Sequence, residues 1–343
     1  MRLVEAVERD DQARDDQAGD DRVRDTLIQA RVRELSRFLE AGLIGGQALV
    51  ERLLIGLLSG GHLLVEGAPG LAKTRAVKLL ARGLHAPFAR IQCTPDLMPA
   101  DLTGTSVWRQ DRNLFEFVAG PIFHSLVLVD EINRAPPKVQ SALLEAMGEH
   151  QVTAAGVTRA LPEPFMVIGT QNPIEHEGTF PLPEAQLDRF MMHVEVTLPD
   201  AAMERLILDL VESETSGATP LEINALSAHD IALAQRAAMR VHLAPALKDY
   251  IVRLVTAARS MTIAPDIAAK IEHPASPRGT LALAAGCKAR AWLAGRDHAT
   301  PHDVRALAGD VLAHRTILTW RALADGDTPR KVIAALLDRI QPL

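Results

Sequence analysis

The sequence is poor in cysteine and in aromatic residues. Its 343 residues include two cysteines, one tyrosine and three tryptophans, and aromatic residues make up 3% of the chain. Cys93 and Cys287 have neither the number nor the spacing of a disulfide framework or a structural zinc site, which fits a reducing, cytoplasmic location. The scarcity of aromatic rings predicts an aliphatic core and leaves few side chains on which nucleic-acid bases could stack.

Long hydrophobic runs and an excess of basic charge are also absent. The start MRLVEAVERDDQ has no apolar signal core, and the most apolar stretch, residues 53–65, is interrupted at residues 59–62 by Ser-Gly-Gly-His. We therefore expect neither a secretory signal nor membrane insertion. The formal net charge is −6, and without a basic stripe along the sequence we expect no nucleic-acid partner.

Charge and periodicity divide the chain into three parts, and its length suits about two domains. Residues 1–25 hold nine acidic residues and five arginines, which is typical of a solvated, disordered tail, with a docking segment for a basic partner as the alternative. In residues 26–200 apolar runs alternate with helical patterns, which predicts a parallel sheet covered on both faces. In residues 201–343 the pattern is helical throughout and predicts helices only. We place the domain boundary near Asp200.

Five apolar runs are the expected strands of this sheet, at residues 62–66, 89–93, 125–130, 165–169 and 192–196. Two other segments interrupt the alternation, at residues 104–119 and 150–162. Each consists of two short β-prone runs around a turn signal, so each predicts a hairpin.

A glycine-rich segment follows the first expected strand and precedes a helix. Its residues are Gly67, Ala68, Pro69, Gly70, Leu71, Ala72, Lys73 and Thr74. In this context backbone N–H groups and the positive end of the helix bind phosphate oxygens, Lys73 reaches the β- and γ-phosphates, and the Thr74 hydroxyl ligates Mg²⁺. Ala72 stands where glycine is usual, and its methyl group restricts φ. Taken alone, the motif leaves open a turn that binds nothing.

Two acidic residues end the third expected strand. Four apolar residues, 126–129, precede Asp130 and Glu131. The strand places Asp130 at its carboxyl end, beside the glycine-rich segment, where ligands bind in open α/β sheets. There Asp130 would hold Mg²⁺ and Glu131 would act as general base on the attacking water. A polar strand end that opens a turn is the alternative for this motif alone.

Three further polar residues are candidates for nucleotide sensing. Asn172 follows the fourth strand and could orient the water, although Asn-Pro is also a common turn starter. Arg189 could reach the nucleotide of the next subunit in trans, and its alternative is a surface pair with Asp188. Arg278 opens a helix and could contact the γ-phosphate, with a solvent-exposed arginine as the alternative.

Together these segments resemble the MoxR family of AAA+ ATPases over roughly residues 26–343. The resemblance rests on GAPGLAKT at 67–74, TPDLMP at 94–99, VDEINRAP at 129–136, GTQNP at 169–173, LDRF at 187–190 and SPR at 276–278. Alanine is common in this family at the position of Ala72. Cys93, where an aromatic residue is common, and the sequence that begins at His314 depart from the family pattern.

The resemblance implies a fold and a mode of action. The fold is an α/β P-loop core, an αβα sandwich with a five-stranded parallel sheet in the order 5-1-4-3-2, joined to an all-α lid. The hairpin at 104–119 is then the insert in helix 2. Ile44 and Gly45 are the expected adenine contacts, ATP and Mg²⁺ the cofactors, and a hexameric ring the active form. Relatives act as chaperone-like factors in the maturation of enzymes or metal centres, often beside proteins with von Willebrand factor A domains.

Three functions are compatible with these features. The first is an ATPase that hydrolyses ATP and remodels a client protein. The second is a nucleotide-gated oligomeric scaffold with little or no turnover. The third is a motor subunit of the chelatase type, which would require a cognate large subunit. Glu131, Asn172 and Arg189 favour hydrolysis over binding alone.

Overall fold

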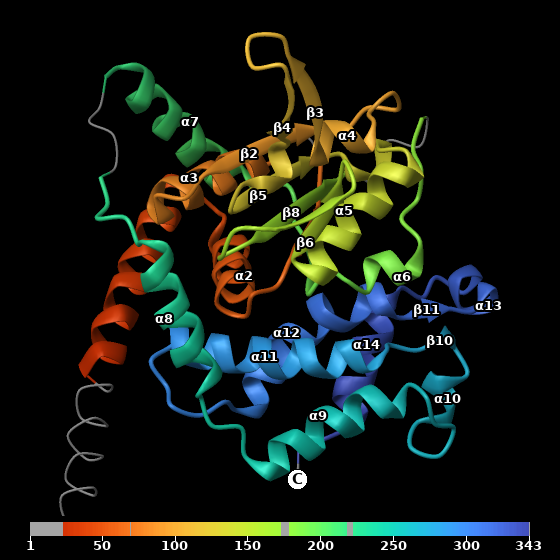
Figure 1. Cartoon of the computed structure of the whole chain (residues 1–343). Coiled ribbons are helices and arrows are strands. Elements are labelled where there is room, and N and C mark those ends of the chain that lie inside the picture. The colour runs from red at the N-terminus through yellow and green to blue at the C-terminus, as the bar shows by residue number, and fades with distance from the viewer. Residues whose placement is uncertain (1–22, 69, 173–177, 218–221, 343) are drawn as a thin grey trace, which may run out of the picture.

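The computed structural model describes residues 23–68, 70–172, 178–217 and 222–342. Figure 1 shows an α/β part, built around a central sheet, beside a helical part. The expected tail at residues 1–25 falls outside the described residues except for its last three, which are helical. Within the described residues no helix is both long and apolar enough to cross a membrane.

Five parallel strands form the central sheet. They are β1 (Leu63–Glu66), β2 (Phe88–Gln92), β5 (Leu126–Asp130), β8 (Met166–Gln171) and β9 (Met192–Glu195). Their spatial order is β2-β5-β8-β1-β9, and each neighbouring pair is parallel. Numbered one to five along the chain and read from the other edge, this is 5-1-4-3-2, so the expected order is confirmed. The carboxyl ends of all five strands therefore share one edge of the sheet.

Helices cover both faces of the sheet. On one face lie the helical residues 23–42, α2 (Gln47–Leu58) and α3 (Lys73–Leu84), and on the other lies α5 (Pro137–Glu149). Neighbouring residues of one strand belong to different cores, so that Leu128 packs in the core with α3 and Val129 in the core with α5. Because both faces are buried, β5 is apolar at every position before Asp130.

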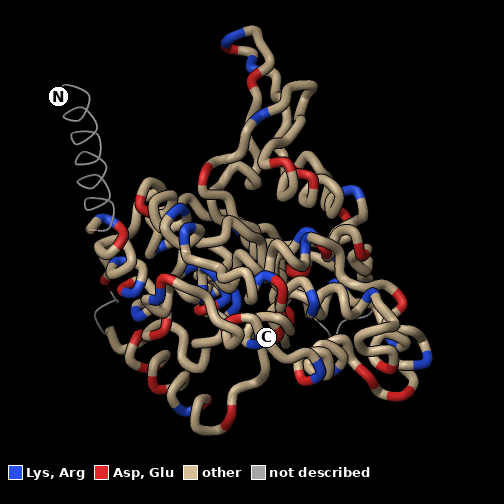
Figure 2. The backbone as a smooth tube through the Cα atoms, turned by 90° about the horizontal axis from the view of Figure 1, so that it is seen from below, with Lys and Arg blue, Asp and Glu red and all other residues tan. Residues whose placement is uncertain are grey.

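Two antiparallel hairpins are attached to this core, as the sequence predicts. The first, β3 (Gly104–Arg109) with β4 (Leu114–Ala119), follows the short helix α4 (Pro99–Thr103), and the second is β6 (Gln151–Ala154) with β7 (Val157–Ala160). The β3–β4 hairpin stands clear of the body in Figure 2. On it Trp108 and Phe115 pack edge to face, with ring centroids 5.0 Å apart, and both rings are exposed.

The helical part is not built from helices alone. Its helices are α8 (Ala228–Met239), α9 (Pro245–Ala257), α10 (Pro265–Ala268), α11 (Pro277–Leu293), α12 (Pro301–Leu312), α13 (Trp320–Ala324) and α14 (Pro329–Arg339). Between them β10 (Ile271–His273) pairs with β11 (Ile317–Leu318) in an antiparallel two-stranded sheet. The expectation of helices only is therefore wrong at these two strands. Strands of two and three residues are too short to show the alternation by which a strand is detected.

The first helix beyond Asp200 contacts the α/β part. In Figure 1, α7 (Ala201–Thr215) lies beside α3. Glu214 near its end accepts two hydrogen bonds from the Arg75 guanidinium of α3. At its beginning the Met203 side chain faces Gly45, where an added Cβ would lie 3.7 Å from the sulfur. No residue of α7 is buried. A domain boundary near Asp200 stays a prediction.

Candidate nucleotide-binding site

The glycine-rich segment connects β1 to α3 at the carboxyl edge of the sheet. The Gly67 N–H donates to the Gln171 carbonyl of β8 at 3.3 Å, and a Cβ at residue 67 would lie 2.7 Å from the Val196 carbonyl oxygen. Gly70 and Ala72 both have positive φ, +85° and +54°. Alanine therefore does adopt the left-handed conformation here, at a cost of roughly 1 kcal/mol. Pro69 lies outside the described residues.

The first turn of α3 is free to receive an anion. Its N-cap residue, Ala72, makes no side-chain cap hydrogen bond, and the first turn contains no acidic residue. The N–H groups of a first turn have no partner within the helix and carry its positive partial charge. Together with the glycine turn they form the type of site that binds phosphate. Leu71 and Thr74, also in this region, are half-buried.

Lys73 lies among the acidic residues of the site. Its ammonium group donates to the Gly67 carbonyl at 2.6 Å and to the Ala68 carbonyl at 3.5 Å. Burial lowers the pKa of Lys73, and the nearby charges of Asp130, Glu131 and Glu66 oppose this shift. Lys73 at the start of α3 thus lies close to Asp130 and Glu131, although these residues are distant in the sequence.

Thr170 fixes the two acids of β5 with one hydroxyl group. Asp130 is 6% exposed, and its Oδ1 accepts a hydrogen bond from Thr170 Oγ1 at 3.0 Å. The Glu131 N–H donates to the same hydroxyl oxygen at 3.0 Å, and Glu131 itself adopts a left-handed conformation, with φ of +57°. Sequence reasoning missed Thr170, because its role depends on β8 lying beside β5.

Three further polar residues surround the acids, and sequence reasoning missed them too. Arg90 on β2 forms an ion pair with Asp130, with 2.6 Å between Nε and Oδ2. Gln92, also on β2, donates to Glu131 Oε2 at 3.1 Å, and Arg134 approaches the same oxygen at 3.3 Å. The signal that could have found Arg90 and Gln92 is the alternation of polar and apolar residues along β2. Residues 90 and 92 are the exposed positions of this strand, and its other positions are buried or half-buried.

Cys93 borders the same acids but adds no nucleophile. Its backbone N–H donates to the Asp130 carbonyl at 3.0 Å. Burial raises the pKa of the Cys93 thiol to about 12, and the charges of Asp130 and Glu131 act in the same direction. The thiol therefore stays protonated at neutral pH and serves as a small apolar side chain.

The hydroxyl and carboxylate groups fit a magnesium nucleotide. Thr74 on α3 and Asp130 on β5 supply the oxygen ligands that Mg²⁺ prefers, and Lys73 supplies a charge for phosphate. Asn172 is 8% exposed and directly follows β8. Ile44 and Gly45 form a turn before α2, and the preceding Gly42 carbonyl accepts a hydrogen bond from Arg75 of α3 at 2.7 Å. The expected adenine contacts are thus linked to the phosphate-binding helix.

Arg189 and Arg278 make their contacts elsewhere. Arg189 donates to the Leu144 carbonyl of α5 at 2.8 Å and crosses Gly148, where a Cβ would lie 2.0 Å from its Nη1. Arg278 Nη1 lies 3.5 Å from Asp188 Oδ2, and this arginine is more than half exposed. The pair anticipated between Arg189 and Asp188 is thus replaced by one between Arg278 and Asp188.

Asp188 joins the lid to the segment that carries Arg189. It accepts hydrogen bonds from Ser276 Oγ at 2.9 Å and from Arg315 Nε at 2.8 Å. The Arg315 side chain is 2% exposed, and it also donates to the backbone carbonyls of Asp188 and Phe190. A buried guanidinium with this many partners is costly to disrupt, so Arg315 fixes the Asp188 segment against the lid.

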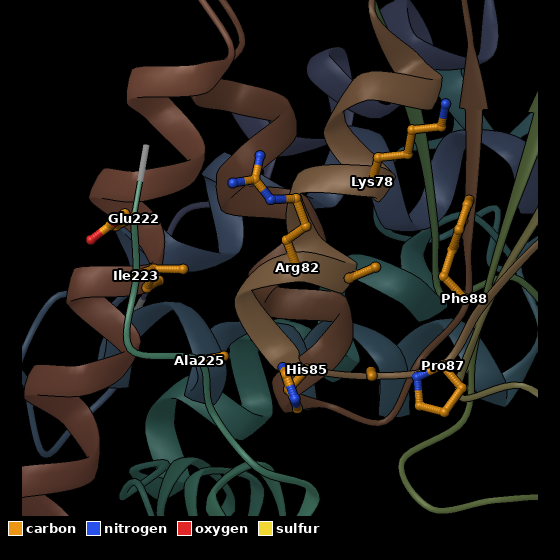
Figure 3. A pocket seen from close by; sticks show the side chains of 10 residues that line it. Lys78, Arg82, His85, Pro87, Phe88, Glu222, Ile223 and Ala225 are labelled. Carbon is orange, nitrogen blue, oxygen red and sulfur yellow. The ribbon is translucent and has the colours of Figure 1, made fainter. Parts of the chain in front are cut away.

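A cavity of about 1020 Å³ lies away from these groups. Figure 3 shows its lining side chains, with Lys78 and Arg82 on α3, His85 just after that helix, and Glu222 and Ile223 on the chain segment beside Arg82. Lys78 and Arg82 belong to later turns of α3, whereas the candidate phosphate-binding groups lie at its beginning. The cavity is therefore not a candidate for the nucleotide phosphates.

Comparisons with known proteins agree with this geometry. Residues 62–192 match the family described as ATPase family associated with various cellular activities (AAA), and residues 263–336 match the AAA lid domain. The Chaperone MoxR1 of Mycobacterium tuberculosis is 45% identical over 87% of this chain and 78% of its own length. Protein MoxR of Paracoccus denitrificans is 33% identical over 84% of this chain and 89% of its own length.

A solved structure gives the same result for the fold. The crystal structure of a candidate ATPase from Cytophaga hutchinsonii superposes with a TM-score of 0.87 at 37% sequence identity, covering 95% of this chain and 99% of the other. The similarity extends over most of each relative's length. It is therefore greater than the similarity that a common P-loop motif alone would produce. The chain therefore belongs to the MoxR family of AAA ATPases.

Proposed function

We propose that this protein hydrolyses ATP to ADP and phosphate and uses the cycle to remodel a client protein. The observation that carries the proposal is the meeting of Lys73, Asp130 and Glu131 at the carboxyl edge of the sheet, where their charges influence one another. They adjoin the glycine turn and the N-terminus of α3, whose N-cap residue makes no side-chain hydrogen bond. Phosphoryl transfer needs positioning and charge stabilisation more than covalent chemistry, and these groups supply both.

Each residue has a defined part in the proposed reaction. The N–H groups at the start of α3 and the Lys73 ammonium group bind the β- and γ-phosphates. Thr74 and Asp130 would hold Mg²⁺, which neutralises charge on the phosphates when bound. Glu131 accepts the proton of the attacking water as general base, and Asn172 orients that water. Ile44 and Gly45 contact the adenine.

Arg189 is proposed to act on the nucleotide of a neighbouring subunit, and Arg278 is proposed to contact the γ-phosphate and report the nucleotide state to the lid. The Arg189 side chain donates to a carbonyl of α5, and the Arg278 side chain pairs with Asp188. Neither of these contacts is made to the glycine turn. A guanidinium supplied in trans stabilises negative charge in the transition state. This arrangement requires a ring, and a hexamer is the proposed form.

The exposed apolar face of α7 supports assembly. Ile207, Leu208 and Val211 lie on one side of this helix, three and four residues apart, and are 36%, 52% and 47% exposed on a helix without a buried residue. A helix with such a face gains stability when a second surface covers it. Because α7 also contacts Arg75 of α3, a neighbour docked there would adjoin the nucleotide site.

The client is proposed by similarity. A relative of this chain is named a chaperone. By similarity, a client protein is proposed here, such as a protein with a von Willebrand factor A domain or an enzyme that receives a metal centre. The exposed Trp108 and Phe115 of the β3–β4 hairpin offer an apolar contact for such a client. Cytoplasmic action is part of the same proposal.

The first prediction tests hydrolysis through Glu131. Glu131→Gln removes the base but keeps the size of the side chain, so turnover should fall about 100-fold or more at matched ATP occupancy. The measurement is steady-state phosphate release with Mg²⁺. Glu116→Gln is the control, because Glu116 also pairs with an arginine, at 2.9 Å, but on the β3–β4 hairpin. Equal turnover in parent and Glu131→Gln would contradict the assigned base.

A gated scaffold is the second candidate, and one observation favours it. Both acids of the site are paired with arginines, Asp130 with Arg90 and Glu131 with Arg134. An acid in such a pair is less available for metal or water. Tight ATP binding with near-zero turnover, unchanged by candidate clients, would support this alternative.

A further inference from the structure

Arg90 places a positive charge on the carboxylate that is proposed to hold the metal. Its Nε lies 2.6 Å from Asp130 Oδ2, while Asp130 Oδ1 accepts from Thr170. Both oxygens of this carboxylate are therefore engaged. The Asp130 side chain is 9% exposed, whereas the Arg90 side chain is 48% exposed. A buried acid is thus neutralised by a half-exposed cation that has room to move away.

Gln92 extends this contact to the second acid. Arg90 Nη2 donates to Gln92 Oε1 at 3.2 Å, and Gln92 Nε2 donates to Glu131 Oε2 at 3.1 Å. Residues 90 and 92 point to the same face of β2, because side chains alternate along a strand. One stretch of β2 therefore contacts both Asp130 and Glu131.

A metal ion and the Arg90 guanidinium compete for Asp130. Two cations that approach the same carboxylate oxygen repel each other, and a charge-assisted hydrogen bond must break before Oδ2 can face the metal. The pair is nevertheless weak enough to exchange, because half of the Arg90 side chain is in solvent.

We propose that Arg90 is a positioning residue that holds Asp130 before the metal nucleotide binds and leaves Oδ2 when Mg²⁺ enters with ATP. Its departure also breaks the hydrogen bond from Arg90 to Gln92, so the Gln92 amide becomes free to turn away from Glu131. This inference rests on the proposed function of the site. It makes the edge strand β2 a link between metal binding and the state of the general base.

The second prediction follows from the charges. Without metal, Arg90 offsets the negative charge of Asp130 near the phosphates, so Arg90→Gln should weaken the binding of metal-free ATP. With Mg²⁺ the competitor is gone, so binding should stay equal or tighten. The ratio of the two dissociation constants, metal-free over Mg²⁺-bound, should therefore rise roughly three- to ten-fold, the range for one partly exposed ion pair.

The experiment measures the affinity of a fluorescent, slowly hydrolysed ATP analogue in EDTA and in Mg²⁺. Arg109→Gln is a matched control, because the Arg109 side chain is also 48% exposed and is also paired, with Glu116 at 2.9 Å. The control should keep the parental ratio. Arg90→Lys retains the charge and should stay within about two-fold of the parent. Circular dichroism checks folding, and Arg90→Met replaces Arg90→Gln if that variant is unfolded.

Two results would overturn the inference. A parental ratio in the neutral Arg90 variant would mean that the guanidinium does not compete with the metal. An equal loss of affinity with and without Mg²⁺ would mean that Arg90 binds phosphate directly. In both cases the parent still binds and hydrolyses ATP, so the proposed function stands. A parent that binds nucleotide with a metal dependence governed by Arg90, but does not hydrolyse it, would support the inference and refute the hydrolysis.

Discussion

At the scale of single residues, the site depends on backbone conformations that side chains usually avoid. Ala72 and Glu131 both adopt positive φ, +54° and +57°, beside the proposed phosphate and metal positions. In the proposed reaction Glu131 acts through its carboxylate, which accounts for a residue other than glycine at this strained position. Strain of this type persists when surrounding contacts fix the conformation, and the bond from Glu131 N–H to Thr170 is such a contact.

The third prediction concerns the strain at Ala72. Ala72→Gly should raise the free energy of unfolding by up to about 1 kcal/mol, because relief of the left-handed conformation exceeds the added freedom of the unfolded chain. Ala155→Gly is the matched control, since Ala155 also has positive φ, +52°, but lies in the β6–β7 turn. Urea unfolding measures both. A loss of stability in both variants would contradict this account of positive-φ alanines.

At the scale of elements, a buried histidine connects the sheet to α5. The Val167 N–H of β8 donates to His62 Nδ1 at 3.1 Å, and His62 Nε2 lies 3.1 Å from the Met147 carbonyl of α5. Accepting at one nitrogen and donating at the other requires the neutral ring. Burial lowers the pKa of His62 from 6.5 to about 4.

The fourth prediction is a pH dependence of stability. The unfolded chain binds a proton at His62 near pH 6.5 and the folded chain only near pH 4, so stability is full above pH 6.5 and falls as the pH drops through this window. From pH 7 to pH 5 this site should cost about 2 kcal/mol. Urea unfolding of the parent and of His62→Gln measures it.

The variant should lose that part of the pH slope. His273→Gln, which alters an exposed histidine of β10, should keep it. An identical pH slope in the parent and in His62→Gln would show that His62 is not the group that titrates.

At the scale of the whole molecule, the proposed site is divided between two surfaces. Lys73, Asp130 and Glu131 form one half, and Arg189, which follows Asp188, forms the other, near Arg278 of α11, which pairs with Asp188. The buried Arg315 side chain couples the second half to the lid. A change in lid position would therefore act on the Asp188 segment, which precedes Arg189.

The fifth prediction tests whether the two halves meet between subunits. Arg189→Ala should bind ATP normally but lose turnover, and mixing it with Glu131→Gln should partly restore activity, because some interfaces then combine intact halves. A mixture of Lys73→Ala with Glu131→Gln is the control, since both changes lie in the same half and no intact site can form. Absence of rescue in a mixture shown to co-assemble would count against action in trans.

Several features could be predicted because their signals are local in the sequence. The glycine turn, the apolar strand that ends in Asp130 and the alternation of strands and helices identify the fold from neighbouring residues alone. The hairpins at residues 104–119 and 150–162 are likewise predicted from the turn signals between their short β-prone runs. The short strands at 271–273 and 317–318 were missed, because pairing between distant segments, not local pattern, creates them.

The sequence by itself determined the parallel sheet, the glycine-rich turn and the two acids, since each follows from periodicity or from a local motif, and the strand order followed from the resemblance to the MoxR family. Tertiary structure alone decided the partners of these groups. Arg90 and Gln92 reach the acids only because β2 lies beside β5, and Thr170 only because β8 lies on the other side of β5. Arg278 meets Asp188 only because the lid packs there. Such contacts depend on which surfaces pack together, and that is a property of the whole chain.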